Sequence, residues 1–99
     1  MPPALPRERR AVANTIRELR GRRRLTQEEV ATAAGIGHNY VSDIEQGRKR
    51  ILFETLLAVT RALGVTLAEF ELVFERQIAE QEQRPASRSA ARPAATRAP

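Results

Sequence analysis

The sequence contains no cysteine and a single histidine, so the usual catalytic and metal-binding side chains are scarce. Without cysteine the chain can form no disulfide bond and can supply no thiolate nucleophile. It also has no paired carboxylates in a glycine-bounded segment, so no nucleophile–base set and no metal cluster can be proposed. We therefore predict that the protein is not an enzyme and binds no metal ion or cofactor.

Long hydrophobic runs are also absent. No apolar stretch approaches the roughly 20 residues that a membrane-spanning helix needs. The N-terminal segment lacks the apolar core of a signal peptide. We therefore expect a cytoplasmic protein that makes no membrane contact.

Large apolar side chains are scarce at both ends of the chain, which leaves room for one small domain between them. Three prolines within residues 1–6 predict a flexible N-terminus. Residues 84–99 consist mainly of Ala, Arg, Pro and Ser, and such a composition cannot bury enough apolar surface to become ordered. The sequence therefore predicts a domain over residues 7–83 and a disordered basic tail over residues 84–99.

Positive charge is unevenly distributed along the chain. Residues 1–64 contain 12 Lys or Arg and 7 Asp or Glu, whereas residues 65–83 contain one Arg and five Glu. A basic N-terminal part suits a polyanionic partner such as nucleic acid. The acidic segment is expected to face away from that partner.

The spacing of apolar residues predicts an all-α chain of five helices. Val12, Ile16 and Leu19 recur at helical spacing and indicate a first helix over residues 7–20, ending near Gly21. The second and third helices are expected over residues 27–34 and 38–46.

The fourth and fifth helices follow a basic loop. The fourth is marked by an apolar stripe that ends at Gly64, and its start is not fixed because Ile51 and Leu52 offer no capping side chain. Thr66 and Glu69 form a capping box for a fifth helix that extends to about Gln83. The residues of the fourth stripe are Phe53, Leu56, Val59 and Leu63.

The last helix carries more apolar side chains than so small a domain can cover. The surplus predicts a dimer contact, and the residues expected to make it are Phe70, Val73 and Phe74.

Residues 25–47 read as two short helices joined by a tight turn. Thr26 and Glu29 form a capping box at the first helix, and Gly35 can take the positive φ that lets the chain leave it sharply. Gly37 can act as the N-cap of the second helix, and Gly47 ends it. This layout is typical of a helix-turn-helix that presents its second helix to a DNA groove.

These residues resemble the Xre family, the lambda-repressor/Cro-like helix-turn-helix proteins, over roughly residues 12–70. Where relatives often carry a proline and a serine or threonine, this chain has Ile51 and Leu52, which adds a similarity to the small controller proteins of restriction–modification systems. The segments that carry the resemblance are residues 25–29 (LTQEE), 34–36 (AGI), 40–42 (YVS), 44–45 (IE), 47 (G), 54–57 (ETLL) and 62–65 (ALGV).

The resemblance implies a lambda-repressor-like domain that binds double-stranded DNA and regulates transcription. It also implies a homodimer on an inverted-repeat operator, with half-sites about one helical turn apart. An asparagine can bond adenine through N6 and N7, and an aspartate can accept from cytosine N4 or instead reject wrong sites through repulsion. The residues expected to read bases are His38, Asn39, Ser42 and Asp43.

Phosphate contacts are implied at the start of the second helix and in the loop after the third. Gln27 could contact phosphate or brace the reading helix, and Tyr40 could contact phosphate or simply pack its ring. Glu45 is expected to be tied to an internal donor, because a free acid there would repel DNA. The residues expected to meet phosphate are Gln27, Tyr40, Arg48, Lys49 and Arg50; for residues 22–24 a solvated surface is an equal alternative.

A second reading of the same fold remains open from the sequence. The domain could be a protein-interaction module, such as an antitoxin whose C-terminal tail wraps a toxin. The tail could also bind nucleic acid without sequence preference, since residues 84–99 carry four arginines.

Overall fold

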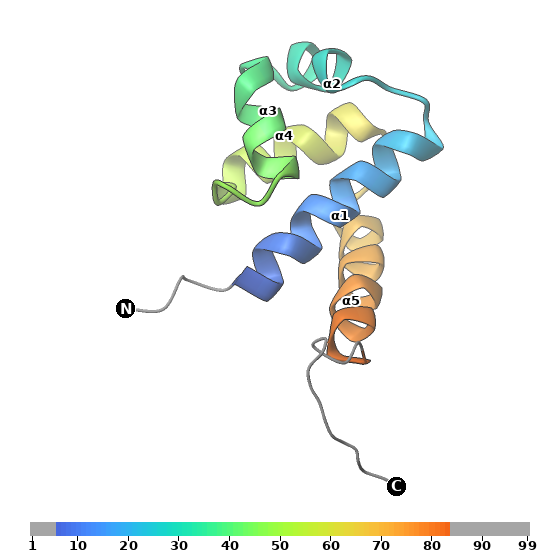
Figure 1. The fold of residues 1–99 in the computed structure, drawn as a ribbon. Helices are drawn as coiled ribbons and strands as arrows, with labels where there is room; N and C mark the ends of the chain where they lie inside the picture. Colours follow the sequence, from blue (N-terminus) through green and yellow to red (C-terminus); the bar gives the residue numbers. More distant parts are fainter. Residues whose placement is uncertain (1–5, 84–99) are drawn as a thin grey trace, which may run out of the picture.

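The computed structural model describes residues 6–83, and these residues form five helices without any strand (Figure 1). The helices are α1 (Pro6–Arg22), α2 (Gln27–Ala34), α3 (His38–Glu45), α4 (Phe53–Leu63) and α5 (Leu67–Gln83). The predicted all-α, five-helix class is confirmed. The predictions for residues 1–5 and for the tail at 84–99 lie outside the described residues, and Pro6 is the first residue of α1.

Two capping boxes begin α2 and α5, as the sequence predicts. The Thr26 hydroxyl accepts a hydrogen bond of 3.0 Å from the Glu29 amide, and the Glu29 carboxylate accepts one of 2.8 Å from the Thr26 amide. Thr66 and Glu69 repeat the arrangement with distances of 3.0 and 2.8 Å. Each box satisfies two amides that would otherwise lack a partner at a helix start.

The end of α1 differs from the prediction, because Gly21 does not terminate the helix. The helix continues to Arg22, and the chain turns at Arg24, whose φ is +56°. The Leu25 amide donates to the Arg20 carbonyl at 3.0 Å, and the Arg20 guanidinium donates to the Leu25 carbonyl at 2.9 Å. These bonds fix the turn after the helix. They offset the cost of a glycine inside the helix, which is about 1 kcal/mol relative to alanine.

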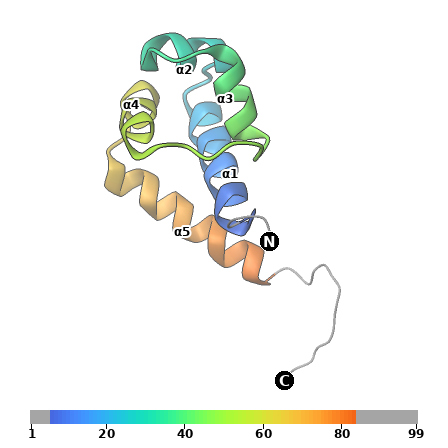
Figure 2. The ribbon, with the colours of Figure 1, turned by 90° about the vertical axis from the view of Figure 1, so that its left-hand side faces the viewer.

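The central helix is α1, which packs against both α3 and α5, while α2 packs against α3 and α4. Figures 1 and 2 show α2 and α3 at one end of the molecule and α5 at the other, with α1 between them. The cluster of buried side chains at the core consists of Ile16, Leu19, Val30, Ile44, Val59, Leu63, Phe70 and Val73.

Ion pairs hold α5 along α1. Arg7 Nη1 lies 2.6 Å from Glu82 Oε2, and Arg76 pairs with Glu18, which also accepts a hydrogen bond of 3.0 Å from Gln77. Burial by itself would raise the pKa of Glu18, but hydrogen bonds from its partners outweigh it and lower that pKa below the ordinary 4.5. The two helices therefore exchange charges, since Arg7 of α1 pairs with an acid of α5 and Arg76 of α5 pairs with an acid of α1.

The first turn of α4 lies outside the core, contrary to the predicted apolar stripe. Phe53 is 60% exposed and Leu52, the N-cap, makes no side-chain capping bond. Val59 and Leu63 are buried, and Leu56 packs against the core cluster. The stripe that faces the core thus begins at Leu56, because no described helix covers the preceding turn.

The apolar surplus of α5 lies only partly at the predicted residues. Phe70 and Val73 are 3% and 7% exposed, and Phe74 packs against the same core cluster. Since the chain covers Phe70 and Val73 itself, they offer little surface to a second copy, and their assignment to a dimer contact is revised. The exposed apolar side chains of α5 are Leu67 and Leu72, the latter 73% exposed.

Two general findings concern the described part of the chain. No helix within residues 6–83 is long and apolar enough to cross a membrane. No group of three His, Cys, Asp or Glu side chains in the same range could hold a metal ion.

Candidate nucleic-acid interface

A three-residue turn sets the angle between α2 and α3. Gly35 takes φ +74°, and the Ile36 amide donates to the Ala31 carbonyl at 3.0 Å, which closes the end of α2. Ile36 packs against the core, and Gly37, in an extended conformation, precedes α3. The open space around Gly35 shows that its backbone conformation, and not a close contact, requires glycine there.

The third helix has one buried face and one open face. Val41 and Ile44 are 3% and 2% exposed and attach the helix to the core. His38 and Asn39, in the first turn, are exposed, and one turn later Ser42 and Asp43 are half-buried. The spacing of i, i+1, i+4 and i+5 places the four predicted base-reading residues on one face of α3.

A buried carboxylate fixes the end of α3. Glu45 is 2% exposed, and its carboxylate accepts hydrogen bonds of 2.7 and 2.9 Å from the Arg20 guanidinium. It accepts a third bond of 3.0 Å from the Gln27 side-chain amide. These contacts confirm the predicted internal donor, and they place the Gln27 side chain as a brace between α2 and α3.

The pairing also keeps Arg20 charged. Hydrogen bonding to Glu45 raises the pKa of Arg20 above its ordinary value, although burial acts in the opposite direction. A doubly bonded arginine–carboxylate pair is among the stronger polar contacts in proteins and fixes the relative orientation of its two partners.

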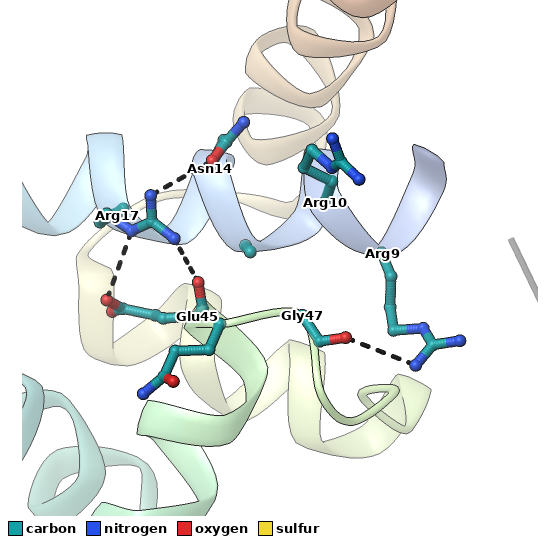
Figure 3. A pocket seen from close by; sticks show the side chains of 8 residues that line it. Arg9, Arg10, Asn14, Arg17, Glu45 and Gly47 are labelled. Carbon is teal, nitrogen blue, oxygen red and sulfur yellow. Dashed lines mark hydrogen bonds and ion pairs between the residues drawn. The ribbon is translucent and has the colours of Figure 1, made fainter. Parts of the chain in front are cut away.

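Arg17 gives α3 a second attachment, to its backbone (Figure 3). Its guanidinium donates to the Glu45 carbonyl, and it also donates to the Asn14 side-chain oxygen at 3.3 Å. Neither Arg17 nor Arg20 was predicted from the sequence as a donor to Glu45. The signal that could have found them is the acid at position 45, which needs cationic donors from a neighbouring helix.

The basic loop after α3 is not free in the isolated chain. Arg48 Nη1 lies 3.3 Å from Asp43 Oδ1, and Lys49 Nζ lies 3.6 Å from Asp43 Oδ2. The side chains of Arg48 and Lys49 remain 61% and 58% exposed, whereas that of Asp43 is 24% exposed. Asp43 therefore holds two loop cations beside the open face of α3.

A smaller contact joins α3 to the rest of the loop. The Tyr40 hydroxyl donates to the Arg50 carbonyl at 3.4 Å, and the Lys49 ammonium lies 5.9 Å from the centre of the Tyr40 ring. The Tyr40 ring also packs against the core, which is one of its two predicted roles. The other role, a phosphate contact, stays a prediction. Five residues predicted to meet phosphate thus border α3: Gln27, Tyr40, Arg48, Lys49 and Arg50.

Comparison with known families and proteins gives a consistent result. Residues 16–70 match the family model HTH_3, helix-turn-helix. The uncharacterized HTH-type transcriptional regulator y4dJ of Sinorhizobium fredii is 38% identical over 61 residues, which span 62% of this chain and 79% of that protein. The immunity repressor protein of Bacillus phage phi105 is 35% identical over 72 residues, which span 73% of this chain and 49% of that protein.

Solved structures share the arrangement of helices. The clp gene regulator ClgR from Corynebacterium glutamicum superposes with a TM-score of 0.74 at 30% identity, covering 78% of this chain and 82% of that chain. The restriction–modification controller protein C.Esp1396I, as a tetramer in complex with its natural 35 base-pair operator, gives a TM-score of 0.70 at 22% identity, covering 73% of this chain and 95% of that chain. At 22% identity the second similarity concerns the fold alone.

Proposed function

Because the chain belongs to the helix-turn-helix family HTH_3, we propose that it is a sequence-specific DNA-binding regulator of transcription that acts as a homodimer on an inverted repeat. Family membership over residues 16–70 confirms the Xre-like resemblance predicted over roughly residues 12–70. The observation that carries the proposal is the state of α3, which is held at its buried end by Glu45 and open at its first turn. A reading helix needs both properties, since its base contacts must enter a groove at a fixed angle.

Base recognition is assigned to the open face of α3. Asn39 lies exposed in the first turn, where its amide can make two hydrogen bonds to adenine. His38 lies beside it, and Ser42 and Asp43 follow one turn later on the same face. Asp43 reaches a base only after giving up its two cations, so its role is coupled to the loop.

Phosphate contacts are assigned to both ends of the helix pair. Arg48, Lys49 and Arg50 follow α3 directly and are exposed. At the other end, the capping box uses the amides of Thr26 and Glu29, so the phosphate contact is assigned to the backbone amides of Gln27 and Glu28, while the Gln27 side chain braces Glu45. Such contacts fix the register of the protein on DNA, and the base contacts supply sequence preference.

Dimerisation is assigned to the exposed apolar surface of α5. Leu67 and Leu72 are exposed, and Phe74 borders a groove of about 330 Å³ between α1, α4 and α5. We expect a dimer at tens of micromolar protein that Leu67→Glu, which places a charge on the lining of this groove, converts to a folded monomer in sedimentation experiments. Thr32→Glu adds the same charge to an exposed site on α2 and should leave the dimer intact. A wild-type monomer under these conditions would contradict the assignment.

The DNA-binding proposal is tested by separating the two kinds of contact. The preferred site is first selected from a random duplex library, and each variant is then titrated with salt on that site and on scrambled DNA. Asn39→Ala should lose about 1–3 kcal/mol on the selected site alone. Arg48→Ala should weaken both duplexes and lower the salt slope by about one.

The control is Arg61→Ala, which removes an exposed arginine from the end of α4 that lies away from the loop (Figure 1). It should change neither the specific nor the scrambled affinity by much. Equal weakening of both duplexes by Asn39→Ala would show that α3 does not read bases. The antitoxin-like alternative would then be favoured, although the tail on which it rests lies outside the described residues.

A further inference from the structure

A hollow of about 270 Å³ lies between α1 and the chain that follows α3 (Figure 3). One wall comes from Arg9, Arg10, Asn14 and Arg17 of α1, and the other comes from residues 45–47. Ala13, whose side chain is a methyl group, forms part of its lining and leaves the space open. We call this site the arginine hollow.

Two of the three arginines of the hollow, Arg9 and Arg17, are held in place by the chain opposite them. Arg9 donates to the Gly47 carbonyl at 3.4 Å, and Arg17 donates to the Glu45 carbonyl and to Asn14. A guanidinium has five N–H donors, so Arg17 keeps donors beyond those it uses here. Anchored guanidinium groups lose less conformational entropy when they bind an anion than free ones do.

The charge of the hollow is positive and poorly compensated. The acidic side chain on its lining is Glu45, which is 2% exposed; its carboxylate is bonded to Arg20 and lies 3.9 Å from Arg17 Nε, so it leaves Arg10 without a counter-ion on this lining. Arg10 is exposed, and no acidic side chain within residues 6–83 lies in ion-pair distance of it. In contrast, Arg7 and Arg22, at the two ends of the same helix, both pair with glutamates of α1.

The position of the hollow relates it to the basic loop. Gly47 borders the hollow and is followed at once by Arg48, Lys49 and Arg50. The eight residues of α3 separate the hollow from the first turn, which at 1.5 Å per residue is roughly 10 Å. The hollow therefore lies beside the basic loop and away from the turn of α3 that carries His38 and Asn39.

We propose that the arginine hollow seats a phosphate group of the DNA backbone outside the bases read by α3, with Arg10 and Arg17 as its donors. This inference rests on the DNA-binding function proposed above and extends its footprint from α2, α3 and the loop to α1. The contact lengthens the stretch of duplex that the protein needs for full affinity. A flanking phosphate contributes to binding even where the flanking bases are not read.

The test uses Arg10→Ala, because Arg10 makes no described contact whose loss would disturb folding. On a selected site with long flanks, its affinity should fall and its salt slope should drop by about 0.9. Between 50 and 200 mM salt, the ratio of wild-type to variant affinity should therefore change about threefold. Arg10→Lys should restore part of the loss, and Arg61→Ala should behave like the wild type.

Chemically altered duplexes locate the contact. Neutral methylphosphonate groups are placed at single flanking phosphates, one duplex at a time. The wild-type protein should weaken at one flanking position per half-site, and Arg10→Ala should be insensitive at that position. On a duplex shortened so that it no longer contains this phosphate, the wild-type protein and Arg10→Ala should bind equally.

The outcomes separate the two proposals. If the wild-type protein binds no duplex with sequence preference, the proposed function fails. If Asn39→Ala abolishes preference but Arg10→Ala matches Arg61→Ala on every duplex, only the arginine hollow is refuted. If inorganic phosphate shifts the NMR signals of the Arg10 and Arg17 side chains while flanking duplex changes nothing, the ligand is a free phosphate and the DNA assignment is overturned.

Discussion

Glu45→Ala is the substitution that we expect to destabilise this fold most, relative to the few atoms that it removes. The carboxylate is 2% exposed and accepts two bonds from Arg20 and one from Gln27. Its removal leaves these donors facing a cavity and breaks the side-chain bonds from the end of α3 to α1 and α2, while the bond from Arg17 to the backbone carbonyl at position 45 remains. The variant therefore tests whether the buried pair, rather than the apolar contacts of Val41 and Ile44, holds α3 in place.

The expected loss of unfolding free energy is about 3 kcal/mol. Breaking a buried ion pair by removing one partner costs about 3–5 kcal/mol. The lower end applies here because the Arg20 side chain is 21% exposed and water can solvate part of the abandoned guanidinium. In a domain of this size such a loss corresponds to a melting temperature lower by roughly 12–24 °C.

The measurement is urea unfolding of Glu45→Ala, Arg20→Ala and the double variant, followed by circular dichroism. Glu28→Ala removes one carboxylate from an exposed site on α2 and serves as the control, with an expected loss below about 1 kcal/mol. The two single losses should not add, because either change already breaks the pair. A loss below about 1 kcal/mol for Glu45→Ala, or full additivity in the double variant, would refute this reasoning.

Three other residues give independent tests. Because hydrogen bonds lower the pKa of Glu18, its contribution to stability is present above the ordinary pKa of 4.5 and is lost as pH falls below it; acid titration of Glu18→Gln should show a smaller loss than the wild type. Thr66→Ala should cost about 1 kcal/mol in thermal unfolding, because the capping hydroxyl of α5 is removed. Asp43→Asn should raise affinity for scrambled DNA about three- to tenfold at low salt, since Arg48 and Lys49 lose their internal counter-ion; unchanged affinity would show that this ion pair does not compete with phosphate.

The sequence by itself determined the features that depend on neighbours in the chain. The capping boxes at Thr26 and Thr66 and the turn at Gly35 were predictable, since each involves groups within about four residues. The helix-turn-helix family was recognisable for the same reason, because its motif is a fixed series of local spacings over residues 25–47. The need of Glu45 for an internal donor also followed from its place on the helix that was predicted to face DNA.

Only the tertiary structure decided which groups meet across helices. Arg20 lies 25 residues from Glu45 in sequence, and no local pattern identifies it as the donor. Phe70 is buried whereas Phe53 is exposed, although both fit an apolar helical stripe. Periodicity gives the apolar face of a helix, but burial depends on which other helix covers that face, and this is fixed by the packing of α1 against α3 and α5.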